Sequence, residues 1–279
     1  MATIEQPAHN AHTPGNKNMT GASQSQSTGA ESSGSAGTAT GQAPPSSTLS
    51  DRAVAWARDA RGLSSVTLLQ LNVFAGTEFF PKLDRKSEGL FFRYGDGWKA
   101  RSFPEKAFIS KKGTKPGFWN LNAVLAGSSE TVFITEGELD ACSLVEAGIS
   151  ADAVLSVPTG GRDRGNEESG LSYVGEALDA GLNRVRKFVL CVDADAKGIG
   201  LRESLAVILG KVRVWFVDWP EGLKDANDML ISDGPEALLD LITNGALEWP
   251  VRAFIGYRSF QRSPQSKRGT QGSLSGMAG

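Results

Sequence analysis

The sequence predicts an α/β fold built on a mainly parallel sheet with helices on both faces. The first observation is a regular alternation of apolar runs and helix-like segments after residue 129. The second is the content of the apolar runs, which are rich in Val, Ile, Leu and Phe, as in strands buried on both faces. The third is the helical periodicity of the intervening segments, several of which end at glycine. Folds of this class bind ligands at the carboxyl ends of their strands.

Predicted strands and helices alternate along residues 129–250, which we predict to form one domain. The strands are expected at residues 131–135, 153–158, 187–193 and 212–220. The helices are expected at residues 137–148, 170–181, 198–210 and 225–245, the last as one or two helices. Since each helix connects two strands, neighbouring strands should be parallel.

A small mixed α+β subdomain is predicted before it, at residues 51–128. Residues 50–62 indicate a short amphipathic helix with a Ser or Asp N-cap and Gly62 beyond its end. Aromatic-rich runs broken by Gly and Asp then indicate a small antiparallel sheet with a hairpin turn at residues 94–97. These runs cover residues 67–80, 88–95 and 97–104.

Both ends of the chain differ in composition from this core. Residues 1–50 consist mainly of Ser, Gly, Thr, Ala, Gln and Pro, and we expect a disordered tail because they cannot bury enough apolar surface. Residues 251–279 are basic and rich in Ser and Gly, which is typical of a flexible tail or linker. A basic tail can add weak, salt-sensitive affinity for nucleic acid.

Net charge and hydropathy limit the partners and the cellular location that we expect for this protein. The formal net charge is −2 and the isoelectric point is near 5.8, so any nucleic-acid binding needs a local basic face. No apolar run is long enough to span a membrane, and the first residues lack the layout of a signal peptide. We therefore expect a cytoplasmic protein without a membrane partner.

Histidine and cysteine content excludes several kinds of site. His9 and His12 both lie in the predicted tail, which argues against a histidine base or a histidine-bound metal in the folded region. Cys142 and Cys191 are far apart in apolar contexts, which predicts two buried, reduced thiols. No zinc site is expected, because too few Cys and His ligands are available.

Acidic residues follow three of the predicted strands. The first strand is followed by Glu136, Glu138 and Asp140, the third by Asp193 and Asp195, and the fourth by Lys224, Asp225, Asn227 and Asp228. Because parallel strands end at one edge of a sheet, these carboxylates should converge, and they would repel each other without a cation. Oxygen ligands of this kind suit Mg²⁺ or Mn²⁺, which makes phosphoryl chemistry the leading reaction class.

Other folds with acids or phosphates at strand ends fit less well. A response-regulator receiver uses one phosphoacceptor and has no need of the ITEGELDA turn at residues 134–141. A dinucleotide-binding fold requires a glycine-rich loop after its first strand. A phosphate-loop NTPase requires the motif GxxxxGK[ST], which is absent from the chain.

Four motifs in order resemble the Toprim domain: ITEGELDA, SVPTGG, CVDADAKG and KDAND, within residues 129–235. Upstream, FFRYGDGWKARSFPEKAF and KPGFWNLNAVL resemble the RNA-polymerase part of phage-type primase–helicases and Twinkle. The chain is therefore similar to Toprim-domain primases over residues 64–250. The resemblance implies a Toprim-type parallel sheet preceded by a small primase subdomain.

The resemblance also implies roles for individual residues. The implied catalytic residues are Glu136, Asp193 and Asp195, and the implied metal ligands are these three with Asp225. Glu138 and Asp140 would be supporting acids. The residues expected to hold nucleotide or DNA phosphates are Lys99, Arg101, Lys106, Arg162 and Lys224, although Lys99, Arg101 and Lys106 also fit a solvated strand face. Gly160 and Gly161 follow a strand end, where they either cradle a phosphate through backbone N–H groups or form a simple turn.

The activity implied is metal-dependent synthesis of short RNA primers on single-stranded DNA during replication. The expected partners are the template strand, NTPs and a replicative helicase acting in trans, because neither a zinc module nor a helicase domain accompanies the motifs. A phage or mobile-element source is the expectation from this family. Two alternatives stay open: a Toprim nuclease using the same metals, and a non-catalytic single-strand or helicase-binding module.

Aromatic residues in the same region have two interpretations. They could stack on bases, as in single-strand binders, or fill the core of a small sheet, and we favour the core. The residues concerned are Phe91, Phe92, Trp98, Phe118 and Trp119.

Overall fold

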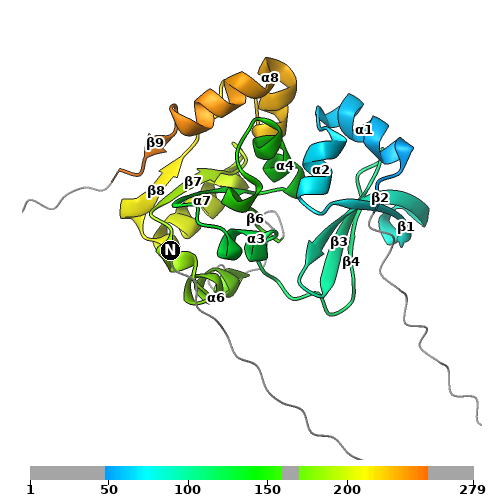
Figure 1. Cartoon of the computed structure of the whole chain (residues 1–279), viewed down its shortest axis with the longest axis horizontal. Coiled ribbons are helices and arrows are strands. Elements are labelled where there is room, and N and C mark those ends of the chain that lie inside the picture. Colours follow the sequence, from blue (N-terminus) through cyan, green and yellow to red (C-terminus); the bar gives the residue numbers. More distant parts are fainter. Residues whose placement is uncertain (1–47, 159–169, 251–279) are drawn as a thin grey trace, which may run out of the picture. The chain divides into compact units, whose positions relative to one another are not determined.

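The computed structural model describes residues 48–158 and 170–250, which form two sheets with helices packed around them (Figure 1). The first sheet has the order β1-β2-β3-β4 and the second the order β6-β5-β7-β8-β9. All neighbours in the first sheet are antiparallel, whereas β5 to β8 are parallel and only β9 is antiparallel. The predicted α/β fold class, with a mainly parallel sheet after a mixed α+β part, is confirmed.

The first part of the described chain runs from helix α1 to helix α3. Its elements are α1 (Asp51–Arg61), α2 (Ser65–Gln70), β1 (Phe74–Phe80), η1 (Pro81–Leu83), β2 (Arg85–Tyr94), β3 (Gly97–Ser102), β4 (Phe108–Ser110) and α3 (Leu121–Ala126). The predicted caps of α1 are present: the Ser50 hydroxyl accepts from the Ala53 N–H, and Gly62 has a φ of 65°. A left-handed glycine at this position ends a helix without a steric penalty.

One run predicted as strand is partly helical. The first four residues of the 67–80 run belong to α2, because the Ser64 hydroxyl accepts from the Thr67 N–H and starts a helix there. Asn72, with a φ of 54°, then turns the chain into β1. An N-cap serine therefore overrode the apolar pattern in this run.

The second part contains the parallel sheet. Its elements are β5 (Thr131–Thr135), α4 (Glu138–Glu146), η2 (Ala151–Ala153), β6 (Val154–Ser156), α6 (Ser172–Asp179), η3 (Leu182–Arg184), β7 (Lys187–Cys191), α7 (Ala196–Leu209), η4 (Lys211–Arg213), β8 (Val214–Phe216), α8 (Ala226–Thr243) and β9 (Leu247–Glu248). Helix α8 is kinked at Gly234, where φ is 87° and Pro235 follows, which agrees with the expectation of one or two helices.

Alternating strand residues supply a core on each face of the parallel sheet. Phe133 and Val189 pack with residues of α4 and α8, whereas Ile134 and Leu190 pack with residues of α6 and α7. Figure 1 shows α4 and α8 on one side of this sheet and α6 on the other. The first of these cores continues into α2 and β2, and the Lys99–Glu138 ion pair joins β3 to the first turn of α4.

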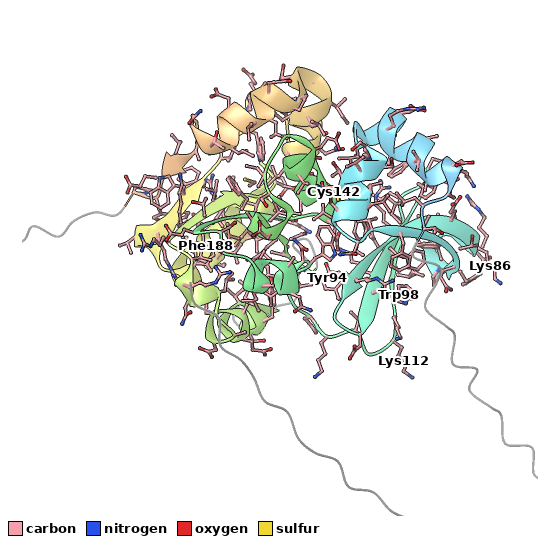
Figure 2. All side chains as sticks on the ribbon, viewed as in Figure 1. Lys86, Tyr94, Trp98, Lys112, Cys142 and Phe188 are labelled. Carbon is pink, nitrogen blue, oxygen red and sulfur yellow. The ribbon has the colours of Figure 1, made fainter. Side chains whose placement is uncertain are left out.

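Cys142 on α4 and Cys191 at the end of β7 are both buried and unbridged, as predicted (Cys142 is labelled in Figure 2). Burial raises the pKa of each thiol well above its usual range. Both side chains therefore belong to the core and have no redox partner within the described residues.

The predicted tails lie almost wholly outside the described residues, which leave out 1–47 and 251–279. Within the described ranges, no helix is both long enough and apolar enough to cross a bilayer.

Candidate active site

Three carboxylates meet where the parallel strands end. Asp140, Asp193 and Asp225 each present an oxygen atom, and these oxygens all lie within 4.8 Å of one another. Asp140 lies in the first turn of α4, Asp193 follows β7, and Asp225 is the N-cap of α8. Because β5 and β7 are adjacent and parallel, the segments that follow them reach the same edge. Three acids distant in sequence thus form one cluster, which we call the acid cluster.

Local structure fixes the position of these side chains. The Asp225 carboxylate accepts from the Asp228 N–H at 2.8 Å, which starts α8 at this point. The backbone N–H of Asn227 donates to Asp140 at 3.3 Å, which joins α8 to α4. Gly198 lies against the Asp193 backbone so closely that a Cβ there would lie 2.1 Å from the Asp193 carbonyl oxygen. Glycine is therefore required for α7 to start beside Asp193.

The charges of the acid cluster oppose one another. Burial raises the pKa of Asp140 well above its usual range, and the neighbouring Asp225 and Asp193 raise it further. Burial also raises the pKa of Asp225. Lys224 offsets part of this charge, since its ammonium donates to Asp193 at 2.6 Å.

The acid cluster fits a divalent cation. Its donors are carboxylate oxygens, which Mg²⁺ and Mn²⁺ prefer, and its raised carboxyl pKa values show that added positive charge would be favourable. A cation bound by these oxygens would relieve the repulsion that burial intensifies. The expected acidic site at the strand ends is thus present as a group of three acids.

The structure divides the acids that the sequence singled out. Asp140, expected as a supporting acid, lies in the acid cluster with Asp193 and Asp225. Glu136 directly follows β5 and is half-buried. Asp195 is instead the N-cap of α7, where its carboxylate accepts from the N–H groups of Lys197 and Gly198 at 3.0 Å.

Glu138 joins the two sheets instead of facing the acid cluster. Its buried carboxylate accepts from the Tyr94 hydroxyl at 2.6 Å and pairs with the Lys99 ammonium at 2.8 Å. Lys99 also donates to the carbonyl of Pro158 at the end of the β6 segment. Burial and the negative charge of Glu138 raise the pKa of Tyr94, which keeps its hydroxyl a donor. We call Tyr94, Lys99 and Glu138 the Glu138 clamp (Tyr94 is labelled in Figure 2).

The other predicted phosphate-binding cations have different surroundings. Arg101 is buried, and its guanidinium lies 4.8 Å from the centre of the Trp56 ring. Burial and the nearby Arg61 lower the pKa of Arg101 to about 10, so it is still charged at neutral pH. Lys106 is exposed and its ammonium lies over the Phe108 ring. Arg162, Gly160 and Gly161 lie outside the described residues.

Two residues beside the acid cluster had no role assigned from the sequence. Arg61, at the end of α1, donates to the Asn227 side chain at 3.0 Å and lowers the pKa of Asp140. The buried Asn227 amide donates in turn to the Arg61 carbonyl and to Ser143. The KDAND motif could have pointed to Asn227, whereas Arg61 carries only the ordinary signal of a basic helix end.

The aromatic residues considered as base-stacking candidates fill the core, as favoured. Phe91, Phe92, Phe118 and Trp119 are buried, and Trp98 is half-buried against Phe91. Phe92 and Trp119 meet edge to face at 5.4 Å, which connects β2 to the segment before α3.

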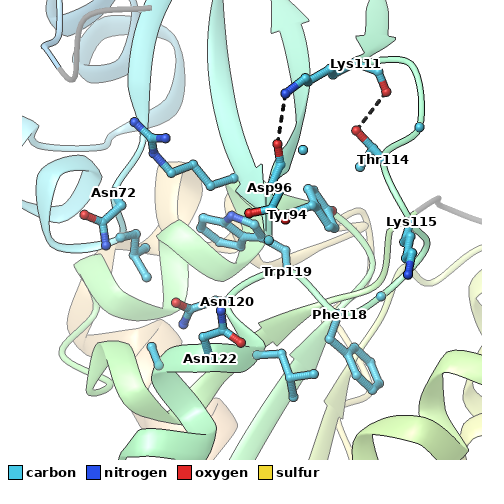
Figure 3. A pocket seen from close by; sticks show the side chains of 18 of the residues that line it. Asn72, Tyr94, Asp96, Lys111, Thr114, Lys115, Phe118, Trp119, Asn120 and Asn122 are labelled. Atoms are coloured by element: carbon cyan, nitrogen blue, oxygen red, sulfur yellow. Dashed lines mark hydrogen bonds between the residues drawn. The ribbon is translucent and has the colours of Figure 1, made fainter. Parts of the chain in front are cut away.

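A basic cavity of about 660 Å³ lies between the β2–β3 hairpin and the β4–α3 segment (Figure 3). Its cations are Arg93, Lys111, Lys112 and Lys115, and its one acidic residue is Asp96. Glycines at the rim leave open space, because a Cβ at Gly95, Gly113 or Gly117 would meet nothing within 4 Å. The Tyr94 side chain also lines this cavity, so the Glu138 clamp borders it.

Comparison with known proteins gives a family match for the second part of the chain. The profile of a family described as Toprim-like matches residues 133–230, which contain the whole acid cluster. A primase homolog protein of Arabidopsis thaliana is 32% identical over 168 residues, covering 56% of this chain and 48% of the relative. The Arabidopsis Twinkle homolog, chloroplastic/mitochondrial, is 30% identical over 168 residues, covering 56% of this chain and 23% of the relative. The chain thus spans about half of the first relative and about a quarter of the second.

Two solved structures have a similar fold. The primase fragment of the bacteriophage T7 primase-helicase superposes with a TM-score of 0.51 at 19% identity, covering 66% of this chain and 71% of that one. The Aquifex aeolicus primase, with zinc-binding and RNA-polymerase domains, superposes with a TM-score of 0.51 at 14% identity, covering 71% of this chain and 56% of that one. At these identities the comparison concerns the fold.

Proposed function

We propose that this chain, which carries a Toprim-like domain at residues 133–230 and shares the fold of solved primase fragments, is a metal-dependent DNA primase. The reaction would join ribonucleoside triphosphates into a short RNA primer on a single-stranded DNA template, each 3′-hydroxyl attacking an α-phosphorus with release of pyrophosphate. The observation that carries this proposal is the acid cluster at the strand ends, together with Lys99 of β3, which pairs with Glu138 two residues before Asp140. In this proposal residues 51–128 form the primase subdomain and residues 129–250 the Toprim domain.

The acid cluster would hold Mg²⁺ or Mn²⁺ through Asp140, Asp193 and Asp225. When bound, such an ion neutralises triphosphate charge and activates the attacking primer 3′-hydroxyl. Glu136, which directly follows β5, would accept the proton of that hydroxyl. Asp195 flanks the cluster and, besides capping α7, would steady the Lys224 ammonium 4.0 Å away.

The predicted phosphate-binding cations would orient the triphosphate. Lys99 is fixed by Glu138 and Pro158, and Lys106 is exposed beside it, so both can direct an ammonium towards phosphate oxygens. Arg101 is buried on Trp56, so we propose that it acts through its positive field instead of by direct contact. Arg162, which follows the β6 segment, stays a candidate for the same task.

The basic cavity offers a surface for the template. It has four cations against one acid, and among the described residues none of the four pairs with a carboxylate. A phosphodiester backbone would satisfy such a surface without a metal ion, unlike a triphosphate. The relative named Twinkle and the T7 primase-helicase motivate a further proposal, that a replicative helicase acts with this chain in trans.

Primer synthesis tests the proposal directly. The wild type, Asp193→Ala and Asp233→Asn would be incubated with single-stranded DNA pools, labelled NTPs and Mg²⁺ or Mn²⁺. Labelled oligoribonucleotides should form with the wild type and with Asp233→Asn, an exposed acid of α8, and should be lost with Asp193→Ala. Metal-dependent cleavage of the DNA instead of synthesis would identify a nuclease. Binding of single strands without either reaction would identify a non-catalytic module.

A further inference from the structure

Phe108 is an exposed aromatic residue beside Lys99 of the Glu138 clamp. It lies on the edge strand β4 and its exposed fraction is 42%, whereas the aromatic residues weighed earlier are buried or half-buried. Phe108 is paired in register with Arg101 of β3, so the two side chains project from the same face of the first sheet. Leu90 pairs with Arg101 as well and belongs to the core shared with α4, so this is the face that packs towards α4, whose first turn supplies Asp140.

Two lysines lie over the Phe108 ring. The Lys99 ammonium is 5.1 Å and the Lys106 ammonium 5.7 Å from the ring centre. Lys99 at the same time holds Glu138, which lies two residues before Asp140 in the first turn of α4. The ring is therefore connected through one lysine and one carboxylate to the helix turn that supplies an acid of the cluster.

This arrangement differs from an ordinary surface phenylalanine. An exposed ring with two ammonium groups 5.1 Å and 5.7 Å from its centre combines a flat apolar surface with charges that attract phosphate. A nucleotide has the matching parts, because a planar base is joined to its phosphates through one sugar. A protein partner would fit less well, since a single ring bordered by charges is not an extended apolar patch.

We propose that Phe108 stacks on a nucleobase while Lys99 and Lys106 contact the phosphates attached to it. This inference rests on the proposed function and adds a base-binding residue to it. The base belongs either to the incoming nucleotide or to the template strand, since both carry the same chemistry. Stacking on aromatic residues is tolerant of base identity, so Phe108 contributes affinity and position more than sequence preference.

Equilibrium binding in Mg²⁺ with two matched pairs of probes tests the inference. The first pair is ATP and inorganic tripolyphosphate, and the second is a single-stranded oligodeoxynucleotide and its abasic counterpart of equal length. The proteins are the wild type, Phe108→Leu, Phe108→Trp and Phe79→Leu. Phe79 is a matched control because it is 48% exposed on β1, the opposite edge of the same sheet.

Phe108→Leu should weaken the base-containing member of one pair by at least about fivefold and leave the base-free member unchanged. A loss for ATP assigns the base to the nucleotide, and a loss for the oligodeoxynucleotide assigns it to the strand. Phe108→Trp should bind as the wild type does, because tryptophan also stacks, and Phe79→Leu should have no effect. Equal losses within both pairs would mean that the ring only seats the lysines, and no loss at all would likewise overturn the inference.

Binding and synthesis can fail separately. A measured effect of Phe108→Leu in a protein that makes no primer would leave the stacking role standing and remove the proposed reaction. Primer synthesis by the wild type, with probe binding unaffected by Phe108→Leu, would support the proposed reaction and remove the stacking role. If the wild type bound none of the four probes, both the stacking role and the proposed reaction would be contradicted.

Discussion

The Lys224 ammonium lies 2.6 Å from Oδ2 of Asp193 and 4.0 Å from Oδ2 of Asp195. The hydrogen bond to Asp193 raises the pKa of Lys224, so the ammonium is charged at neutral pH. Its side chain is half exposed, which means that solvent screens the pair and leaves the lysine free to move away. Lys224 therefore offsets the acid cluster in a form that a divalent cation could displace.

Replacing Lys224 with glutamine should increase the effect of metal on stability. Without the ammonium the three carboxylates repel each other more strongly, so the melting temperature in EDTA should fall. Saturating Mg²⁺ should then raise the melting temperature by more than in the wild type, with a lower midpoint concentration. Thermal unfolding across a Mg²⁺ series measures both, with Lys86→Gln on β2 as the control (Lys86 is labelled in Figure 2). An equal metal response in all three proteins would show that Lys224 does not neutralise the cluster.

Replacing Asp140 with asparagine should stabilise the metal-free protein at neutral pH. Its folded-state pKa is raised, so the folded chain binds this proton more tightly than the unfolded chain does. Stability from this group is full below the unfolded pKa of about 3.9 and declines as the pH rises towards the folded-state value. Asparagine has no such decline and still accepts from the Asn227 N–H.

The gain from Asp140→Asn should therefore be largest at neutral pH and vanish as the pH falls towards about 4. Urea unfolding in EDTA over that pH range measures it, and the same variant should lose the stabilisation by Mg²⁺. Asp233→Asn, the same change at an exposed position of α8, should show neither effect. If Asp140→Asn were less stable than the wild type throughout this pH range, the ionised Asp140 would not be destabilised by burial and charge repulsion.

The Tyr94 hydroxyl should contribute measurably to the Glu138 clamp. Tyr94→Phe removes a 2.6 Å hydrogen bond to a buried carboxylate, which leaves Glu138 with Lys99 alone. We expect a loss of roughly 1.5–3 kcal/mol in the free energy of unfolding, as for hydrogen bonds to charged groups. Tyr173→Phe is the matched control, because that buried ring packs edge to face on Phe118 and not on a carboxylate. Similar losses in both variants would indicate that the clamp adds nothing beyond packing.

Much of the fold and part of the site followed from sequence patterns. Strand ends can be located from apolar runs, so the meeting of residues after β5 and β7 was predictable. Which acid of each turn enters the cluster was not, because that depends on caps and helix rotation. Asp195, predicted as a metal ligand, also caps α7, and its metal role stays a prediction. Asp140, predicted as a supporting acid, has an oxygen in the cluster.

The surroundings of the basic residues on β3 were harder to predict, for a different reason. Arg101 alternates correctly with Lys99 along β3, yet it is covered by α1 through Trp56, and no local pattern reports such long-range packing. No sequence pattern singles out Phe108, because a three-residue edge strand has too few positions to show which face is exposed. Long-range packing therefore decided both cases.

Two glycines of α7 provide the strictest comparison for the site. A Cβ at Gly198 would lie 2.1 Å from the Asp193 carbonyl oxygen, whereas a Cβ at Gly200 would meet nothing within 4 Å. Gly200→Ala should raise the free energy of unfolding by about 0.5–1 kcal/mol, since alanine favours the helix. Gly198→Ala gains the same propensity but must push Asp193 or the first turn of α7 aside, with a net loss of roughly 1–3 kcal/mol.

The displacement in Gly198→Ala should also weaken the response to Mg²⁺, because Asp193 moves relative to Asp140 and Asp225. Urea unfolding with and without Mg²⁺ for the two variants separates these effects. Gly200→Ala should keep the full metal-dependent gain, and Gly198→Ala should lose most of it even where its fold is intact by circular dichroism. If Gly198→Ala kept the wild-type metal response, the position of the Asp193 backbone would not matter for the cluster, and the metal would have to be bound elsewhere.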